Sequence, residues 1–328
     1  MKAQNTSVSP FDGDSLREAA KRLCAGEVVA VPTETVYGLA ADATNPAAVA
    51  RIFEAKGRPS FNPLIVHLDF EQAQAHGWFD ARALALARAF WPGPLTLVVP
   101  RRASSSLVPA VSAGLPTVAL RFPAHPVMQA LIAVSGRPLA APSANLSGGV
   151  SPTRAEHVLA SLGGRIPYIL DGGPAECGLE STILAVGAAG VRLLRPGPVT
   201  LEQIETVLNP PGSRDSPIAV DRPSASGRAP VEAPGQLASH YAPSKPVRLE
   251  ADCADAGEWL IGFGGVAGDD NLSESADLDE AAARLFDALH RADSQPRPRI
   301  AVAPIPDHGI GLAINDRLRR ASAPRDER

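Results

Sequence analysis

Cysteine is scarce in this chain, and long apolar runs are missing from it. Cys24, Cys177 and Cys253 are the three cysteines among 328 residues, and no two of them form a CxxC pair. This spacing argues against a disulfide framework or a zinc knuckle, so we expect a reducing, cytoplasmic setting. No apolar run approaches the roughly 18 residues that a membrane-spanning helix requires, and residues 1–10 lack the apolar core of a signal peptide. We therefore expect a globular protein without a membrane partner.

A basic excess is also missing. The net charge is −4, with 17 basic against 16 acidic residues in 1–209 and 14 against 19 in 210–328, which gives +1 and −5. A dedicated nucleic-acid binder usually carries a strong positive excess and aromatic stacking platforms, whereas aromatic residues make up only 5% of this chain. These totals disfavour an RNA-binding module, although a local basic cleft is compatible with them.

Several common catalytic motifs are absent. The sequence contains no Walker A, HExxH or GxSxG pattern, and its seven histidines are scattered rather than clustered. The segment GFGGVA at residues 262–267 matches a loose dinucleotide-binding pattern. An acidic loop follows it in place of the helix that such a site requires, so we expect a plain turn there.

The most distinctive stretch is KGRPSFNPLIVH, from Lys56 to His67. Lys56 is one of only four lysines, and it lies one glycine away from Arg58. A compact ammonium beside a planar guanidinium suits an anionic ligand, and Gly57 allows close backbone approach. The alternative is a solvated turn at the end of a helix, and the dipeptide pattern alone leaves both readings open.

The periodicity predicts alternating helices and strands, which is typical of an α/β fold. Asp14 or Ser15 is the candidate N-cap of the first helix and Asn45 that of the second. Residues 209–244, rich in proline, serine and glycine, are expected to form a linker, and residues 317–328 a polar tail. The expected helices span residues 14–26, 45–55, 81–90, 126–135, a stretch from about 153, 200–208 and 278–291. The expected strands span residues 27–32, 63–68, 95–100, 117–123, 137–142, 168–170, 182–186, 259–263 and 300–305.

Polar side chains follow several of these predicted strands. In an open α/β sheet, loops at strand ends converge on one crevice. A crevice with four cations and no evident nucleophile suits phosphate chemistry driven by positioning and charge stabilisation. Arg121 is costly to bury alone, so we expect it to meet either a carboxylate of the protein or one that arrives with a ligand. The residues expected in the crevice are Thr33, Lys56, Arg58, Asn62, His67, Arg121, Ser143, Asn145, Ser181 and Arg195.

Seven ordered motifs resemble one family. The segments PTETVYGL, KGRPSFNPLIVH, WPGPLT, TVALRFP, APSANLSGGVSPT, GLESTI and LLRPGP, within residues 14–208, closely resemble the YrdC/Sua5 family of threonylcarbamoyl-AMP synthases. APGQLASHYAP (residues 233–243) and the region after it resemble the longer Sua5 form. The resemblance implies a YrdC-like twisted open mixed sheet with helices, plus a smaller C-terminal Rossmann-like α/β domain. It implies a catalytic domain at 1–208, a linker or lid at 209–244 and a Sua5 domain at 245–328.

The resemblance also implies a reaction. A nucleotidyltransferase of this family joins L-threonine, bicarbonate and ATP, with Mg²⁺ on the ATP phosphates rather than on protein ligands. The carbamate attacks the α-phosphate, and threonylcarbamoyl-AMP and pyrophosphate leave. Partner proteins would then install threonylcarbamoyladenosine at position 37 of tRNA, so that contact with tRNA is indirect.

Site roles follow from the same resemblance. Lys56, Arg58, Ser143 and Asn145 are the expected catalytic residues. The expected ATP-binding residues are Lys56, Arg58, Asn62, Thr117, Ser143, Asn145, Ser151 and Arg195. The expected threonine-binding residues are Thr33, His67, Arg121, Ala141 and Ser181, and Tyr241 is the expected lid residue.

Alternatives stay open at this point. His67 can also be read as a hydrogen-bonded histidine at a strand end, and Tyr241 as part of a passive linker. A carbamoyl transferase like the family's relatives in hydrogenase maturation is a rival activity. Those relatives carry acylphosphatase and zinc-binding modules, and this sequence shows neither signature.

Overall fold

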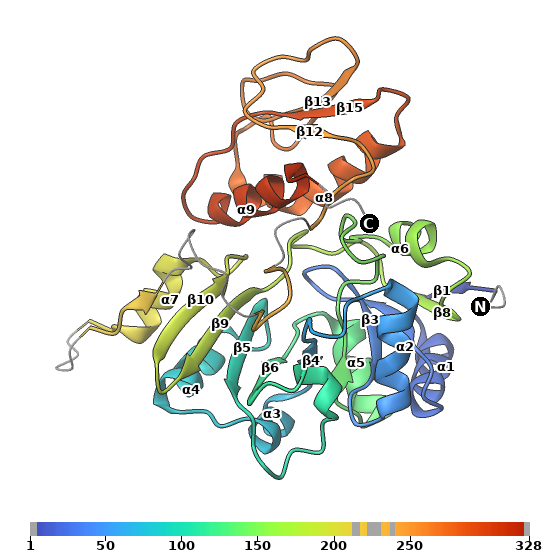
Figure 1. Cartoon of the computed structure of the whole chain (residues 1–328), viewed down its shortest axis with the longest axis vertical. Helices are drawn as coiled ribbons and strands as arrows, with labels where there is room; N and C mark the ends of the chain where they lie inside the picture. The colour runs from blue at the N-terminus through green and yellow to red at the C-terminus, as the bar shows by residue number, and fades with distance from the viewer. Residues whose placement is uncertain (1–4, 212–216, 222–230, 237–239, 325–328) are drawn as a thin grey trace.

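The computed structural model describes residues 5–211, 217–221, 231–236 and 240–324. Two sheets organise it: an eleven-stranded mixed sheet and a four-stranded parallel sheet. Figure 1 shows the second unit, in orange and red, with its helices α8 and α9 turned toward the first unit. The predicted α/β class with a smaller second α/β unit is confirmed.

The large sheet has the strand order β1-β8-β2-β3-β7-β4-β6-β5-β9-β10-β11. Its strands are β1 (Ser7–Pro10), β2 (Val29–Pro32), β3 (Tyr37–Asp42), β4 (Ile65–His67), β5 (Leu95–Pro100), β6 (Thr117–Arg121), β7 (Leu139–Ala140), β8 (Tyr168–Asp171), β9 (Thr182–Gly187), β10 (Gly190–Arg195) and β11 (Val220–Asp221). The helices around it are α1 (Gly13–Cys24), α2 (Pro46–Lys56), α3 (Phe70–His76), α4 (Ala81–Phe90), η1 (Pro109–Ser112), α5 (Pro126–Ser135), α6 (Ala155–Leu162) and α7 (Leu201–Leu208).

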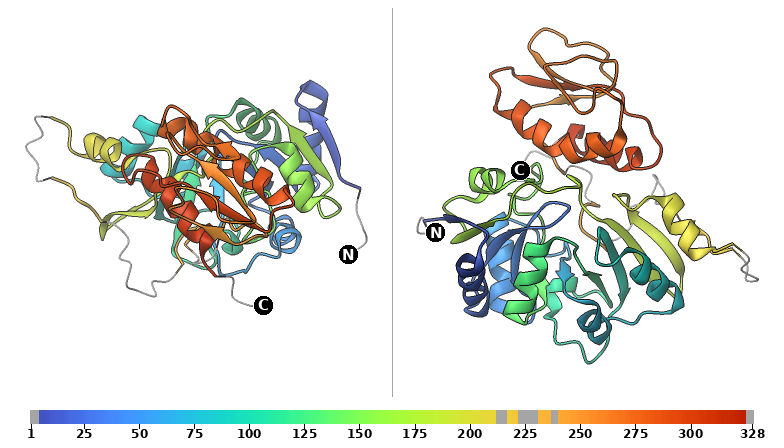
Figure 2. Two further views of the ribbon diagram at one scale, coloured as in Figure 1. Left: turned by 90° about the horizontal axis from the view of Figure 1, so that it is seen from above. Right: turned by 180° about the vertical axis from the view of Figure 1, so that it is seen from behind.

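Helices cover both faces of the sheet around β2. Val29 and Val31 pack with α1 and α5, whereas Val28 and Ala30 belong to the larger core cluster that contains residues of α2 and α6. The strand is buried on both faces, as its continuous apolar run predicted. Figure 2 (right) shows the same arrangement from behind, with α1 in dark blue and α5 in green.

The sheet from β4 to β10 is covered differently. Ile65, Val98, Ile183 and Leu194 form a separate small cluster, and the residue from outside the sheet that packs against them is Ala233, within the predicted linker. A short segment of the linker therefore covers this face of the sheet, whereas a helix covers the opposite face. The site described below lies beside this linker segment.

The second unit contains β12 (Val247–Arg248), β13 (Glu258–Gly262), β14 (Asp270–Asn271), α8 (Leu278–Ser294), β15 (Arg299–Val302) and α9 (Gly311–Ser322). Its strand order is β12-β15-β13-β14. Phe263 bridges to Val266, and β14 follows rather than a helix, which confirms that the segment at 262–267 is a turn.

Several expectations need correction. The α1 helix is capped by Asp12 instead of Asp14 or Ser15, while Asn45 caps α2 as predicted. Arg195 is the last residue of β10, a strand that was not predicted. The predicted linker contributes β11 to the large sheet, and its residues 212–216, 222–230 and 237–239 lie outside the described residues. The strands β1, β3 and β10 and the helices α3 and α9 were not expected.

The prediction of a polar tail at residues 317–328 is wrong for residues 317–322, which belong to α9. Arg317 lies in α9, is fully buried and faces the first unit. Within the described ranges, no helix is long and apolar enough to cross a membrane.

Candidate functional site

A small, partly open cavity of about 40 Å³ lies beside β4, β6 and β10, under the linker. Nine residues predicted for the site line it: Thr33, Arg58, His67, Arg121, Ala141, Ser143, Ser181, Arg195 and Tyr241. Pro234, Gly235 and His240 of the linker line it as well. Ligand pockets usually measure about 300–1,000 Å³, so this cavity has room for a few waters but not for a nucleotide. The linker occupies the remaining space in this conformation.

Lys56 and Arg58 lie where α2 ends. Gly57 adopts a left-handed conformation (φ 59°) that terminates the helix and separates the two cations. The Lys56 Nζ donates to the carbonyl oxygens of Ser143 (2.6 Å) and Asn145. Arg58 donates through Nη2 to the Pro63 carbonyl at 2.8 Å. Lys56 is 2% exposed and Arg58 8%, so the reading of a solvated turn is wrong.

Arg195 approaches from the end of β10. It donates through Nε and Nη2 to the Ser181 carbonyl at 3.1 and 2.9 Å and is also buried. Burial lowers the pKa of Lys56 well below its usual value, and the neighbouring charge of Arg58 lowers it further. Burial likewise lowers the pKa of Arg58 to about 10.

These three cations have no carboxylate within ion-pair distance among the described residues. Among the described residues, the hydrogen bonds of these cations go to carbonyl and hydroxyl oxygens. Burying cations without counter-charges is unfavourable, and an anionic ligand would relieve the cost.

Arg121 and His67 occupy paired positions at the carboxyl ends of β6 and β4. Arg121 Nη2 lies 2.7 Å from Glu34 Oε1, and its Nη1 donates to Thr35 Oγ1 at 2.9 Å. The first of the two alternatives for Arg121, a carboxylate of the protein, is therefore observed. Burial first, and the Arg121 charge second, lower the pKa of His67 to about 3, so that its imidazole is neutral near pH 7.

Hydroxyl groups surround the same end of the cavity. Thr33 Oγ1 donates to the Val36 carbonyl at 2.7 Å. Ser181 Oγ lies 2.8 Å from Thr96 Oγ1 and accepts from Arg195 Nη2 at 3.2 Å. Small donors and acceptors beside Arg121 are suited to a polar amino acid.

Two asparagines carry buried amide atoms without partners. Asn62 makes no side-chain hydrogen bond within the described parts of the chain, although it is only 1% exposed. Asn145 donates through Nδ2 to the carbonyls of Leu146 and Gly149, but its Oδ1 is unsatisfied. Such atoms are rare in folded proteins, and a ligand with hydrogen-bonding groups would satisfy them.

Five predicted nucleotide residues lie outside the cavity lining: Lys56, Asn62, Thr117, Asn145 and Ser151. Ser151 is fully buried, and its Oγ donates to Glu180 Oε1 at 2.5 Å. Thr117 begins β6, at the opposite end of that strand from Arg121, which places it roughly 13 Å away at about 3.3 Å per residue. Its nucleotide contact stays a prediction.

Tyr241 lies in the site. Its side chain is 1% exposed, and its backbone adopts a left-handed conformation (φ 61°). A Cβ atom on Gly235 would come within 2.6 Å of the Tyr241 hydroxyl and 2.9 Å of Arg195 Cδ, so glycine is required for the linker to approach both. The linker is thus packed against the buried cations.

Three functional candidates were missed by sequence reasoning: Glu34, Glu180 and Arg317. Glu34 could have been found, because it lies between two threonines in PTETVYGL and is the one carboxylate of that motif. Glu180 lies in GLESTI. Across the described part of the chain, no group of three or more His, Cys, Asp or Glu residues is placed to hold a metal ion.

Comparisons with known proteins cover most of the chain. Residues 21–197 match the Sua5, YciO and YrdC family model, described as telomere recombination, and residues 199–323 match the C-terminal domain of threonylcarbamoyl-AMP synthase. The threonylcarbamoyl-AMP synthase of Bacillus subtilis (strain 168) is 44% identical over 94% of this chain and 93% of its own. The enzyme of the same name from Pyrococcus abyssi is 41% identical over 94% of both chains.

A solved structure covers both units. The crystal structure of P. abyssi Sua5 complexed with L-threonine superposes with a TM-score of 0.85 at 38% identity, over 97% of both chains. Agreement over the full length in sequence and fold means that this chain belongs to the Sua5-type family of threonylcarbamoyl-AMP synthases.

Proposed function

We propose that Lys56, Arg58 and Arg195 bind the phosphates of ATP, and that the residues around Arg121 bind L-threonine, for the synthesis of threonylcarbamoyl-AMP that names the family. The observation that carries this proposal is the set of three buried cations without carboxylate partners in the described residues. A triphosphate supplies the missing negative charge, and Arg58 and Arg195 offer planar forks to its oxygens.

The threonine end follows from the contacts of Arg121. Its guanidinium contacts Glu34 and Thr35 in this state, so a substrate carboxylate would share it with Glu34 or displace Glu34. Neutral His67, Thr33 and Ser181 then accept from the threonine ammonium and hydroxyl, and Ala141 bounds the pocket. The Pyrococcus relative, whose crystals contain L-threonine, supports this assignment.

The reaction needs no protein nucleophile. Threonine and bicarbonate provide a carbamate, whose oxygen forms a bond to the α-phosphorus of ATP while the bond from that phosphorus to the β-phosphate oxygen breaks. Pyrophosphate leaves with the electron pair. The Lys56, Arg58 and Arg195 charges stabilise the negative charge that develops on it.

Mg²⁺ enters as part of the substrate, on the phosphate oxygens of ATP. The carboxylates next to the cavity are those of Glu34 and Glu180, and each already contacts an arginine. The described residues therefore offer the ion no ligand cluster of their own. Asn62, Ser143, Asn145 and Ser151 are assigned to the nucleotide side, together with Thr117.

The linker serves as a lid in this proposal. Tyr241 and Gly235 fill space that ATP needs, so the linker must move outward for ATP to enter and return afterwards. Closure keeps water from a labile mixed anhydride. We assign residues 1–208 to the catalytic domain, 209–244 to the lid and 245–328 to the Sua5 domain. The product passes in the cytoplasm to proteins that modify tRNA, without direct tRNA contact.

Pyrophosphate release from ATP and Mg²⁺ tests the proposal. We expect release that requires both bicarbonate and L-threonine, and weaker release when serine or glycine replaces threonine. Intact ATP together with a shifted tRNA band in a gel would refute it and favour an RNA-binding module.

A further inference from the structure

The second domain reaches the site through one arginine. Arg317 of α9 is fully buried, and its Nε donates to Glu180 Oε2 at 2.9 Å. Its Nη1 donates to the Pro196 carbonyl at 2.9 Å and to Asp316 Oδ2 at 2.8 Å. One guanidinium therefore binds both the loop before β9 and the segment after β10.

Glu180 connects this arginine to the nucleotide side. It lines the cavity, and while Oε2 accepts from Arg317, Oε1 accepts from Ser151 Oγ. Both carboxylate oxygens are thus engaged. If Arg317 were displaced, Glu180 would lose the hydrogen bond to its Oε2 and would be free to move. The Ser151 hydroxyl, which donates to Oε1 of the same carboxylate, would then lose its fixed position.

Tyr241 is held by the same domain. The guanidinium carbon of Arg317 lies 5.3 Å from the centre of the Tyr241 ring, within the range of a cation–π contact. On another side, the Phe286 ring of α8 lies 5.6 Å from the Tyr241 ring. The lid residue therefore rests between two helices of the second domain.

A close backbone contact also holds the loop that carries Glu180, independently of Arg317. A Cβ atom on Gly178 would come within 2.4 Å of the Ala283 carbonyl oxygen and 2.5 Å of that of Ala282, both on α8. Gly178 also has a positive φ of 66°. The loop that carries Glu180 is thus pressed directly against α8, so its position depends on how the second domain is docked.

We propose that Arg317 is a positioning residue, by which the second domain fixes Glu180 and Ser151 on the nucleotide side and holds Tyr241 over the site. This inference rests on the proposed roles of Ser151 and Tyr241. It assigns the second domain a part in forming the active site, since α9 supplies a side chain that the first domain lacks at this position.

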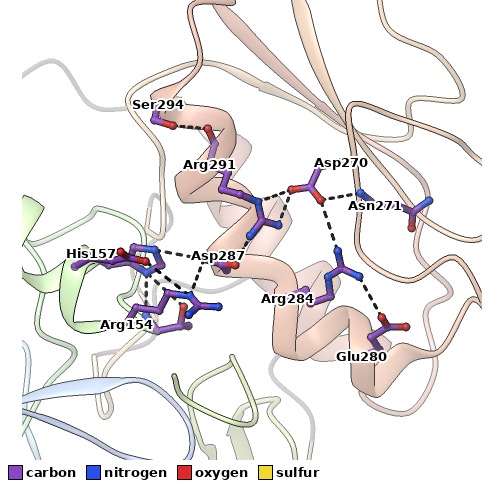
Figure 3. A network of polar contacts seen from close by, with 11 residues as sticks. Arg154, His157, Asp270, Asn271, Glu280, Arg284, Asp287, Arg291 and Ser294 are labelled. Atoms are coloured by element: carbon purple, nitrogen blue, oxygen red, sulfur yellow. Dashed lines mark hydrogen bonds and ion pairs between the residues drawn. The ribbon is translucent and has the colours of Figure 1, made fainter. Parts of the chain in front are cut away.

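Another part of the domain interface provides a control. Figure 3 shows Asp287 of α8 between Arg154 and His157 of the first domain on one side and Arg291 on the other. Arg154 Nε lies 3.3 Å from Asp287 Oδ1 and is partly exposed. Arg154 thus joins the same two domains as Arg317, but its ion pairs are with Glu156 and Asp287, which do not line the cavity, whereas Arg317 binds Glu180, which does.

The test compares Arg317→Met with Arg154→Met in the full chain. Steady-state pyrophosphate release reports kcat and KM for ATP, and calorimetric titration reports threonine affinity. We expect Arg317→Met to lower kcat/KM for ATP on the order of 10- to 100-fold, because misplacement by about 1 Å can cost that much. Threonine affinity should change by less than about twofold, since the Arg121 contacts are separate. Arg154→Met should leave both quantities unchanged.

Two further variants keep the test decisive if Arg317→Met does not fold. Arg317→Lys retains the charge but not the fork, so we expect an intermediate loss in kcat/KM for ATP. Glu180→Gln retains the side-chain volume and should show the same selective loss.

Three outcomes would contradict the proposals. Equal kinetics of the Arg317 and Arg154 variants would overturn the positioning role, and so would an equal loss of ATP and threonine binding, which a merely structural role predicts. A wild-type chain without threonine-dependent pyrophosphate release would instead overturn the proposed site, and the inference with it.

Discussion

The ion pair between Arg121 and Glu34 allows a quantitative test of the threonine site. Their side chains are 3% and 5% exposed, and the two groups lie 2.7 Å apart. Burial alone would raise the pKa of the Glu34 carboxyl, but Arg121 outweighs it, and that pKa lies below its usual value. Both groups are therefore charged near neutral pH, and removal of either one leaves a buried, unpaired charge.

The magnitude follows from this burial. Breaking a buried pair costs about 3–5 kcal/mol, and a domain of this size loses about 2–4 °C in Tm per kcal/mol. Arg121→Met should thus lower Tm by roughly 6–20 °C. The double variant Glu34→Gln/Arg121→Met should recover most of that loss, because no unpaired charge is left.

Stabilisation by threonine distinguishes the role of Glu34 from that of Arg121. A ligand at about 100 times its Kd adds about 2.7 kcal/mol, which corresponds to roughly 5–11 °C in Tm. Wild type should gain that much. Glu34→Gln should gain at least as much, because the substrate carboxylate then neutralises Arg121, whereas Arg121→Met should gain nothing.

Thermal unfolding followed by circular dichroism, with and without threonine, is the assay. Arg17→Met is the control, since Arg17 pairs with Asp14 and the two side chains are 69% and 92% exposed, and such pairs contribute about 0–1 kcal/mol. The reasoning is refuted if Arg121→Met unfolds near the wild-type temperature, or if threonine still stabilises it.

Three further predictions concern other parts of the molecule. Arg58→Ala should keep the fold but lower kcat/KM for ATP by about 10²- to 10³-fold, with the exposed Arg165→Ala as control; normal pyrophosphate release by the Arg58 variant would contradict the phosphate assignment. Tyr241→Ala should raise the ratio of free AMP to threonylcarbamoyl-AMP measured by chromatography, while Tyr241→Phe should not, and equal ratios would argue against a lid. Burial first and His157 second lower the pKa of His290 to about 4. As pH falls, His290 is therefore protonated in the unfolded chain before it is protonated in the folded protein. Protonation favours the unfolded chain, so the free energy of unfolding should fall as pH drops from about 6.5 to about 4. Denaturant midpoints should show a flatter pH dependence for His290→Gln, and an unchanged slope would exclude His290 as the cause.

Local patterns predicted much of the fold. Asn45 caps α2 because its own side chain accepts from Ala47 and Ala48, a contact that neighbouring residues alone determine. The strand β2 was predicted because its apolar run is continuous. By contrast, β3 was missed, because YGLAAD shows no alternation and becomes a strand only by pairing with β2 and β7.

The sequence likewise predicted some residues of the site and missed others. Arg58, His67 and Arg121 line the cavity, and each follows or ends a helix or strand that the sequence predicted. Arg195 lines it as well, but it ends β10, which was not expected. Arg317 was placed in a polar tail because the residues around it are charged. Its burial depends on Glu180, which lies 137 positions away in the chain, and no local pattern reports that contact.

The sequence by itself thus determined the α/β class, the family and the residues of the cationic site, because helix caps, apolar periodicity and ordered motifs are encoded by neighbouring residues. Only the tertiary structure decided that Glu34 pairs with Arg121, that the linker fills the cavity and that Arg317 holds Glu180. Each of these depends on charges and backbones that are distant in the chain and become paired only when burial makes an unpaired charge costly.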